Sequence, residues 1–371
     1  MKKQIIALAL VLLMAFSVMA GCSSAKPAQT APAEPAAAEA PARTEVLTLR
    51  WGATGTGSND DNQWISNGPI IAQIEEKTNG MIKFEYYPSS QLGAESSMLD
   101  QVLMGTLDIC VVNPNTATSV WPELVLMNYP FAYPDLNVFF DTWENPELRA
   151  AVKKLVAAGG AAEYLGISTA GYRGCQNAKR PIRSVADMKG LTFRTMAGQI
   201  YVDLFGAMGA ATASVSASEV FTAIQQGLVD GEETAASFCY DNGYYEAEKY
   251  ATELNAVMST AQIIISSETW AKLSDAEKDI FREACETISR GAQTTFYNEK
   301  IDYYYGKLAE VGMEVIRWND LNAEEQQSFV KAVMPIWDDY KQKIDADFFG
   351  LWKAACAAAW EKNGYEWTYA G

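Results

Sequence analysis

The strongest constraint on the fold is a regular alternation of strand and helix patterns that begins at residue 46. Strand-like segments at 46–52, 81–87 and 107–112 alternate with segments 70–77 and 98–103, in which apolar residues recur at helical spacing. Parallel strands joined through helices need right-handed crossovers. This order therefore predicts an α/β fold with a mostly parallel sheet.

The same alternation continues in a second unit, which begins near Ile167. Its predicted strands and helices lie at 191–194, 228–231 and 263–265, and at 201–208 and 219–226. The last third is helical: Ser274 and Glu277 form a capping-box pattern, another helix starts near 322–325, and Pro335 should kink it. A chain of 371 residues is long for one hydrophobic core, so two domains are expected.

The N-terminus reads as an export signal. Two lysines precede an apolar run of 14 residues, 5–18, which is too short for an ordinary membrane span. Ala20, Gly21 and Cys22 follow, as in a bacterial lipoprotein signal, although Met19 stands where leucine is usual. We expect residues 1–21 to be a lipoprotein signal peptide and Cys22 to carry lipid. The alternative is an uncleaved anchor, and both predict export.

The segment 22–45 has a different composition. It is dominated by alanine and proline and shows no apolar periodicity, so we expect a disordered tether. No later segment is apolar enough to span a membrane. We therefore place the protein in the periplasm or on the outer face of the cell membrane, lipid-anchored through Cys22.

The charged residues exclude several classes of function. The chain has 29 Lys and Arg, 46 Asp and Glu, and a net charge of −17, which disfavours nucleic-acid binding. It has no histidine, which excludes Ser-His-Asp triads, Cys-His pairs and His-ligated zinc. The carboxylate pairs Asp60-Asp61 and Glu232-Glu233 are sequence neighbours, which in a strand point to opposite faces. Binding is therefore favoured over catalysis.

The cysteines and glycines give no cofactor or metal motif. Besides Cys22 there are five cysteines, at 110, 175, 239, 285 and 356, and no two have Cys-x-x-Cys spacing. Cys110 lies in an apolar run and should be buried, while any disulfide pairing stays open. The glycines at 52, 55 and 57 match neither the dinucleotide nor the phosphate-loop pattern. We therefore expect no cofactor and no metal.

Two arginines are candidate anion ligands. Arg194 ends a predicted strand, and ligands of open α/β sheets bind beyond the carboxyl ends of strands. Its guanidinium offers a planar fork that matches a carboxylate. Arg173 stands between two glycines where the second domain begins. The alternative for each is a surface or structural ion pair.

Seven motifs in order resemble one family. They are LRWG at 49–52, EEKTNG at 75–80, YPSSQLG at 87–93, GTLD at 105–108, YPF at 129–131, RPI with ADMKGL within 180–191, and EVFTAIQQGLVDG at 219–231. The pattern is similar to that of substrate-binding proteins of tripartite ATP-independent periplasmic (TRAP) transporters, of the C4-dicarboxylate-binding type. The resemblance covers residues 47 to 345.

The resemblance implies a two-lobed clam-shell, with a long helix that braces both lobes. We assign 46–170 and about 259–298 to lobe I, and 171–258 and about 299–371 to lobe II. A small organic anion would be held in the cleft by an arginine–carboxylate salt bridge. It would then pass to the small and large integral membrane subunits of a permease driven by an ion gradient.

The resemblance also assigns the site. The family's central arginine falls on Arg194, its second arginine on Arg173, and the acidic position after Gln-Leu-Gly on Glu95. The sequence departs from the sialic-acid-binding branch at three positions, Asn113, Ala217 and Thr234. Trp51, Thr54, Tyr172 and Phe238 are further candidates to line the cavity.

Two other functions stay open at this point. A binding protein of an ATP-driven transporter or of a sensor system would share the clam-shell and the lipid anchor. An exported enzyme, such as a lyase that uses carboxylates and tyrosines, would turn its ligand over instead of releasing it intact. Neither the ligand nor the oligomeric state follows from the sequence.

Overall fold

The computed structural model describes residues 43–169 and 171–367. The predicted signal peptide, Cys22 and most of the predicted tether lie outside the described residues. At the end of the predicted tether, the Arg43 guanidinium is bound to the folded part. It donates hydrogen bonds to the Glu277 carboxylate at 2.8 and 3.1 Å and to the Lys272 carbonyl at 2.8 Å.

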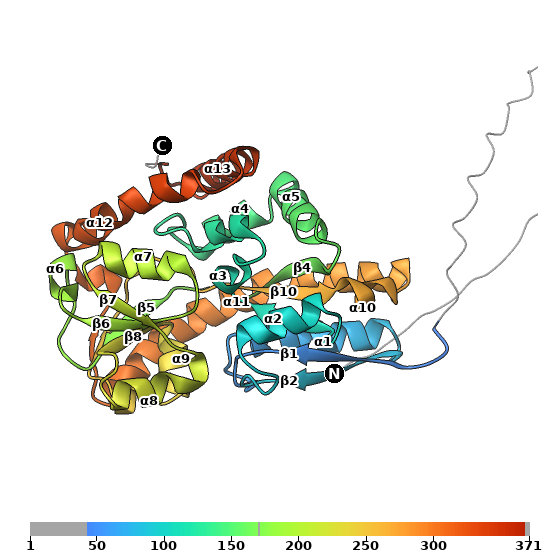
Figure 1. The fold of residues 1–371 in the computed structure, drawn as a ribbon, viewed down its shortest axis with the longest axis horizontal. Helices are drawn as coiled ribbons and strands as arrows, with labels where there is room; N and C mark the ends of the chain where they lie inside the picture. Colours follow the sequence, from blue (N-terminus) through green and yellow to red (C-terminus); the bar gives the residue numbers. More distant parts are fainter. Residues whose placement is uncertain (1–42, 170, 368–371) are drawn as a thin grey trace, which may run out of the picture. The chain divides into compact units, whose positions relative to one another are not determined.

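The first sheet has five strands in the order β2-β1-β3-β10-β4. Their bounds are β1 Leu47–Gly52, β2 Ile82–Tyr87, β3 Ile109–Val112, β4 Ala162–Thr169 and β10 Ala261–Ser266. Strand β1 is parallel to β2 and β3, whereas β10 is antiparallel to β3 and β4. The mostly parallel sheet predicted from the sequence is therefore a mixed sheet, because β10 returns from the second half of the chain and inserts between β3 and β4 (Figure 1).

The second sheet has six strands in the order β11-β9-β5-β8-β6-β7. Their bounds are β5 Gly174–Asn177, β6 Thr192–Thr195, β7 Ala211–Ser214, β8 Gly231–Thr234, β9 Tyr250–Thr252 and β11 Glu314–Ile316. The strand predicted at 228–231 is wrong in position: the pairing starts at Gly231 and runs to Thr234. Leu228, which suggested the earlier start, is 62% exposed. Gly231 has no room for a side chain, because a Cβ atom would collide with the Gln176 carbonyl oxygen.

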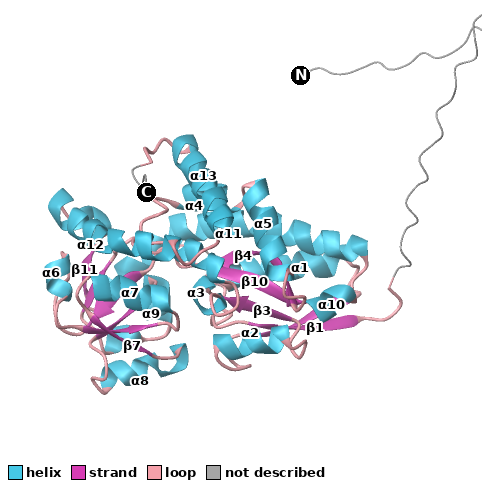
Figure 2. Cartoon of the chain, turned by 45° about the horizontal axis from the view of Figure 1, so that its top comes forward, coloured by secondary structure: helices cyan, strands magenta, loops and turns pink. Residues whose placement is uncertain are grey.

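Helices surround both sheets (Figure 2). Their bounds are α1 Trp64–Lys77, α2 Glu95–Leu103, α3 Pro114–Ala117, α4 Leu136–Trp143, α5 Pro146–Ala157, α6 Val185–Met188, α7 Gln199–Ala207, α8 Val220–Gln225, α9 Ala236–Asp241, α10 Ser267–Ala271, α11 Asp275–Glu310, α12 Ala323–Lys341 and α13 Ala346–Lys362, with short 3-10 turns η1 Pro122–Asn128, η2 Ala217–Glu219, η3 Tyr244–Glu246 and η4 Trp318–Asp320. None of the helices in the described part of the chain combines the length and the apolar composition needed to cross a membrane. The cysteines at 110, 175, 239, 285 and 356 are all buried free thiols.

The 36-residue helix α11 contacts elements of both sheets. Its N-terminus has the predicted capping box between Ser274 and Glu277. It packs against α1 and β4 at the first sheet and against α9 and β11 at the second (Figure 1, orange). Midway along it, the Gln293 side-chain amide donates hydrogen bonds to the carbonyl oxygens of Asn62 and Ser168. The helix therefore contacts both sheets, and the Gln293 hydrogen bonds hold it to the first one.

The last two helices pack on different parts of the structure. Helix α12 runs through Pro335 as one element and contacts α6 and α7, whereas α13 contacts α4 and α5. Three indole N–H groups, from Trp337, Trp352 and Trp360, hold this region to the loop before α4. They donate to the Pro130 carbonyl, the Tyr133 hydroxyl and the Ala132 carbonyl, at 3.0, 2.9 and 2.8 Å. The lobe assignment stays a prediction, with 46–170 and about 259–298 in lobe I and 171–258 and about 299–371 in lobe II. Helix α13, which this assignment places in lobe II, packs on α4 and α5 from the range of lobe I.

Replacing Phe281 by alanine should lower the free energy of unfolding by about 3–5 kcal/mol. The ring is fully buried where α11 meets the first sheet, and it packs against Phe84 and Trp270 at centroid distances of 6.0 and 6.2 Å. Equilibrium urea unfolding measures the change. Val311→Ala, at a 43% exposed position just after α11, is the control and should change stability by less than about 0.5 kcal/mol. Equal losses in the two variants would contradict this account of α11.

Candidate functional site

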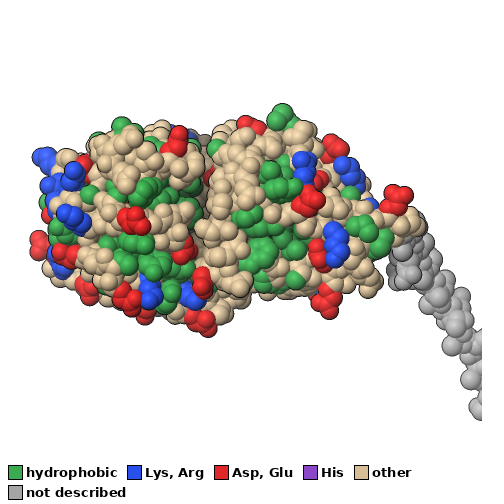
Figure 3. Space-filling model, turned by 90° about the horizontal axis from the view of Figure 1, so that it is seen from below, with side chains coloured by type: hydrophobic (Ala, Val, Ile, Leu, Met, Phe, Trp, Pro, Cys, Tyr) green, Lys and Arg blue, Asp and Glu red, His purple; other side chains and the backbone are tan. Residues whose placement is uncertain are grey.

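A cavity of about 380 Å³ lies between the two sheets. Many of its lining residues stand at or just beyond the carboxyl ends of strands. Examples are Thr54 after β1, Asn113 after β3, Thr169 in β4, Ser214 in β7 and Thr234 in β8. A narrow groove divides the face of the molecule seen in Figure 3, as expected for a cavity between the two sheets. This is the place where α/β sheets bind ligands, since loops there are free to carry polar groups.

The structure brings eight of the ten candidate residues to this cavity. They are Arg194, Arg173, Glu95, Asn113, Thr234, Ala217, Phe238 and Thr54. They come from loops and strand ends spread between positions 54 and 238. The structure thus shows that these side chains lie at one cavity, whereas their contact with a ligand stays a prediction.

The structure places Trp51 elsewhere, so the prediction that it lines the cavity is wrong. The side chain is fully buried and packs against Phe84 and Tyr86, at centroid distances of 5.8 and 6.4 Å. These residues belong to the core cluster of the first sheet. Tyr172 is also buried outside the main cavity, and its hydroxyl donates a 2.6 Å hydrogen bond to the Tyr133 carbonyl.

Arg173 forms a buried ion pair with Glu233. Its Nε donates to Oε1 and its Nη2 to Oε2 of that carboxylate, the latter at 3.0 Å, and Nη2 also reaches the Glu233 carbonyl at 2.7 Å. The side chains are 7% and 3% exposed. Burial by itself lowers the pKa of Arg173, but the neighbouring acidic groups, Glu233 first among them, together raise that pKa above its usual value. The structural ion pair named as the alternative for this arginine is therefore present.

Arg194 is buried without a carboxylate partner. Its Nε donates a 2.8 Å hydrogen bond to the Val215 carbonyl, and the residue is 4% exposed. Between residues 43 and 367, with 170 left out, no Asp or Glu oxygen lies within 4.0 Å of its guanidinium. Burial lowers the pKa of Arg194, and the nearby Glu232 opposes this effect. An arginine keeps its charge under such shifts, so the cavity presents a cation whose terminal nitrogens are available to an anion.

Two further predicted residues are engaged within the protein. The Glu95 carboxylate accepts hydrogen bonds from the Asn113 backbone N–H at 2.9 Å and from the Thr116 hydroxyl at 2.6 Å. The Asn113 side chain accepts from the Asn115 N–H and donates to the Thr260 carbonyl, at 2.9 and 2.7 Å. Burial raises the pKa of Glu95. These bonds fix the start of α3 at the cavity wall.

The sequence reasoning missed most of the hydroxyl groups that line the cavity. They belong to Ser89, Ser90, Ser96, Thr116, Thr169, Ser214, Ser216, Ser218, Ser259 and Thr260. Only one local signal was present, the alternation of serine along 214–218. The other hydroxyls come from separate loops, which only the tertiary structure assembles.

Residues 59–343 match a family model described as bacterial extracellular solute-binding protein, family 7. Two relatives come from Vibrio cholerae. The C4-dicarboxylate-binding periplasmic protein DctP is 26% identical over 308 residues, which cover 82% of this chain and 88% of the relative. The sialic acid-binding periplasmic protein SiaP is 27% identical over 273 residues, with coverages of 73% and 82%.

A solved structure is also similar in both fold and sequence. A TRAP periplasmic solute-binding protein from Polaromonas, bound to D-erythronate, has a TM-score of 0.76 and 27% identity, and the match covers 84% of this chain and 98% of that one. A second, from Anaerococcus prevotii with bound D-glucuronate, has a TM-score of 0.77 at 21% identity, and shows the shared fold.

Replacing Glu233 by glutamine should lower the free energy of unfolding by about 3–5 kcal/mol, because the buried guanidinium of Arg173 loses its counter-charge. The matched control is Glu325→Gln. Glu325 binds Arg183 with the same two-pronged geometry, at 2.8 and 3.1 Å, but that arginine side chain is 44% exposed. Solvent screens such a pair, so the control should cost about 1 kcal/mol or less. Chemical denaturation compares the two variants, and an equal loss in both would contradict the structural role of the buried pair.

Proposed function

Because this chain belongs to family 7 of the bacterial extracellular solute-binding proteins, we propose that it is the substrate-binding component of a TRAP transporter. It captures a small organic anion and passes it to the small and large integral membrane subunits of a permease driven by an ion gradient. It is a transport protein that binds its solute, and not an enzyme. The comparisons support this function over a component of an ATP-driven or sensor system.

The observation that carries the proposal is the unpaired, buried guanidinium of Arg194. Arg173, the other arginine of the cavity wall, already has the Glu233 carboxylate as its partner. A carboxylate in the cavity would complete the hydrogen bonding of Arg194 with two parallel N–H···O bonds. Arg194 is therefore the main ligand of the anion, and Arg173 holds the wall in place and offers at most one further N–H.

The lining also indicates the chemical class of the anion. Arg194 and Arg173 are the only cationic side chains among the lining residues that the structure describes, and one of them is neutralised. A second carboxylate on the ligand would find hydroxyl groups and Glu95 in place of a cation. The many serine and threonine hydroxyls are well suited to a polyol. We therefore propose a hydroxylated monocarboxylate, a choice that the bound D-erythronate of the Polaromonas protein supports.

Closure over the ligand follows from general electrostatics. Excluding water strengthens the charged hydrogen bonds to Arg194, and the ligand favours the closed form only by its additional affinity for it. One contact already crosses between the two halves: the Asn115 side-chain amide donates a 2.7 Å hydrogen bond to the Ala197 carbonyl. Gly198 follows, and a Cβ atom there would collide with the Asn115 amide. A glycine at this position lets the two walls approach each other.

Export and anchoring complete the proposal. Residues 1–21 are proposed as a lipoprotein signal peptide and Cys22 as the lipidated residue. The Ala- and Pro-rich segment that follows would let the binding unit stay near the membrane surface. An extracellular family supports the export step, and the lipid itself rests on the sequence pattern alone.

Ligand screening tests the proposed site. The protein is unfolded thermally with C4-dicarboxylates, 2-oxo acids, aldonic and uronic acids, and amino acids. A hydroxylated monocarboxylate should raise the melting temperature by several degrees at about a thousandfold excess over its dissociation constant. Arg194→Ala should lower affinity for that ligand by about 3–5 kcal/mol, more than a hundredfold, because a buried carboxylate loses its partner.

The control for this variant is Arg282→Ala, which removes an exposed arginine on α11, outside the cavity lining, that pairs with Asp279 and lies over the Trp270 ring. Its affinity should match the wild type. Binding by Arg194→Ala within threefold of the wild type would contradict the site. Tighter binding of a C4-dicarboxylate than of any hydroxylated monocarboxylate would contradict the ligand class and leave the site assignment standing.

Membrane fractionation tests the anchor. The wild-type chain should sediment with membranes and be released by detergent, since a lipid chain holds it there. Cys22→Ala should leave the protein uncleaved by the lipoprotein route and without lipid on residue 22. Ser23→Ala is the control and should behave as the wild type. A mature N-terminus other than Cys22, read by mass spectrometry of the wild type, would contradict the proposal.

A further inference from the structure

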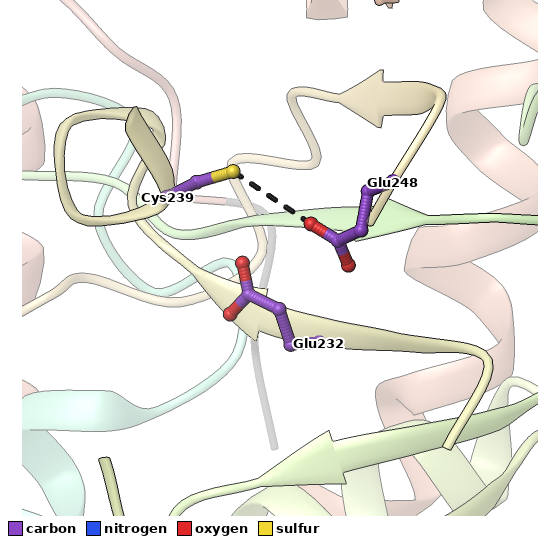
Figure 4. A group of neighbouring side chains, drawn as sticks. All are labelled: Glu232, Cys239 and Glu248. Carbon is purple, nitrogen blue, oxygen red and sulfur yellow. Dashed lines mark hydrogen bonds between the residues drawn. The ribbon is translucent and has the colours of Figure 1, made fainter. Parts of the chain in front are cut away.

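Three ligand-type side chains meet behind the cavity wall. Glu232 comes from β8, Cys239 from α9, and Glu248 from the segment between η3 and β9. One thiol sulfur and one oxygen of each carboxylate all lie within 4.8 Å of one another. Figure 4 shows the Glu232 carboxylate directed toward the Glu248 carboxylate and the Cys239 sulfur. The residues are 0%, 0% and 4% exposed.

Most of the oxygens in this cluster have no partner. Neither carboxylate oxygen of Glu232 takes part in a hydrogen bond with the described residues, and the same holds for Oε1 of Glu248. The one bond within the cluster runs from Cys239 Sγ to Glu248 Oε2, at 3.7 Å. A buried carboxylate without hydrogen bonds is unfavourable, because it has lost its hydration and gained no partner in return. A fully buried and unpartnered Glu232 therefore indicates that another group belongs in the cluster.

In the part of the chain that the structure describes, no lysine or arginine forms an ion pair with Glu232 or Glu248. Arg194 is the register neighbour of Glu232 across β6 and β8, yet it forms no ion pair with it within 4.0 Å in the described structure. Arg173 is committed to Glu233, on the opposite face of β8. Two carboxylates so close together repel each other when both are charged. A bound cation would remove this repulsion and satisfy the free oxygens together.

We propose that Glu232, Cys239 and Glu248 bind a divalent cation of the zinc type. A thiolate selects borderline and soft cations, whereas Ca²⁺ and Mg²⁺ prefer six or more oxygen ligands. At a tetrahedral centre with a metal–sulfur distance of about 2.3 Å and a metal–oxygen distance of about 2.0 Å, the sulfur and oxygen are about 3.5 Å apart. The 3.7 Å between Cys239 and Glu248 is close to this value. Water or a second carboxylate oxygen would take the fourth position.

The charges balance on binding. Burial raises the pKa of Glu232 to about 8 and that of Cys239 well above its usual value, so the metal-free cluster holds protons. The cation displaces the thiol proton and any carboxyl protons to solvent. Two carboxylates and one thiolate around a divalent ion leave a charge of −1, and the neighbouring Arg194 offsets it. The bound ion would fix β8, which carries Thr234 at the cavity and Glu233 as the partner of Arg173, so its role is structural.

The test uses the whole chain, purified without metal-affinity resin and treated with a chelator. Added Zn²⁺ should bind at about one equivalent per chain and raise the melting temperature by several degrees. Co²⁺ should give a thiolate-to-cobalt charge-transfer band. Cys239→Ser should abolish that band, and Glu232→Gln and Glu248→Gln should weaken Zn²⁺ binding by at least about tenfold. Cys285→Ser, at a buried thiol in α11, should bind as the wild type.

The opposite result separates a metal site from a pair of carboxyls that share protons. In that case neither ion would bind, the wild-type melting temperature would not change with Zn²⁺, and Glu232→Gln would raise it by removing a poorly solvated acid. This outcome would overturn the proposal. The cobalt band and the Zn²⁺-dependent melting of the wild type keep the test decisive even if a variant fails to fold.

Discussion

This binding site depends on the charge of one guanidinium, which is almost fully buried and has no carboxylate partner among residues 43–169 and 171–367. Arg194 is held by one hydrogen bond from Nε to the Val215 carbonyl. Burial strengthens the electrostatic interactions of this guanidinium, since two charges at a given distance interact several times more strongly in the protein interior than in water. Arg173 has the same chemistry but a different role, because its carboxylate partner belongs to the protein. One arginine therefore recognises the ligand and the other builds the wall beside it.

The scaffold that holds these arginines is built from contacts between distant parts of the chain. Strand β10 joins the first sheet after the chain has passed through most of the second. Helix α11 then contacts both sheets. The C-terminal helices add a set of indole hydrogen bonds to the loop before α4. The chain passes from one sheet to the other more than once, and the cavity lies between the two sheets. Each wall is therefore built on its own sheet, and a change in the separation of the sheets would open or close the cavity.

The two neighbouring glutamates of β8 illustrate how a strand separates functions. Alternation along the strand directs Glu233 to Arg173 and Glu232 to Cys239 and Glu248. The first forms a buried ion pair next to the ligand cavity. The second belongs to a cluster with free oxygens, for which we propose a cation. A change in the second cluster would reach the cavity through β8 and through Arg194, the register neighbour of Glu232.

The sequence by itself determined the local features. The α/β alternation, the capping box of α11, the burial of Cys110 and the positions of both arginines follow from patterns within a few residues. The transport family follows from seven ordered motifs. Local patterns are reliable because periodicity and capping involve residues at most four positions apart.

Only the tertiary structure decided which of these groups face one another. Glu233 pairs with Arg173 from 60 positions away, Trp51 turns into the core of the first sheet, and β10 inserts antiparallel between β3 and β4. The hydroxyl lining and the cluster of Glu232, Cys239 and Glu248 come from separate elements. These contacts cannot be predicted from spacing in the sequence, because the partners are far apart along the chain. The order and register of the strands decide which of them become neighbours.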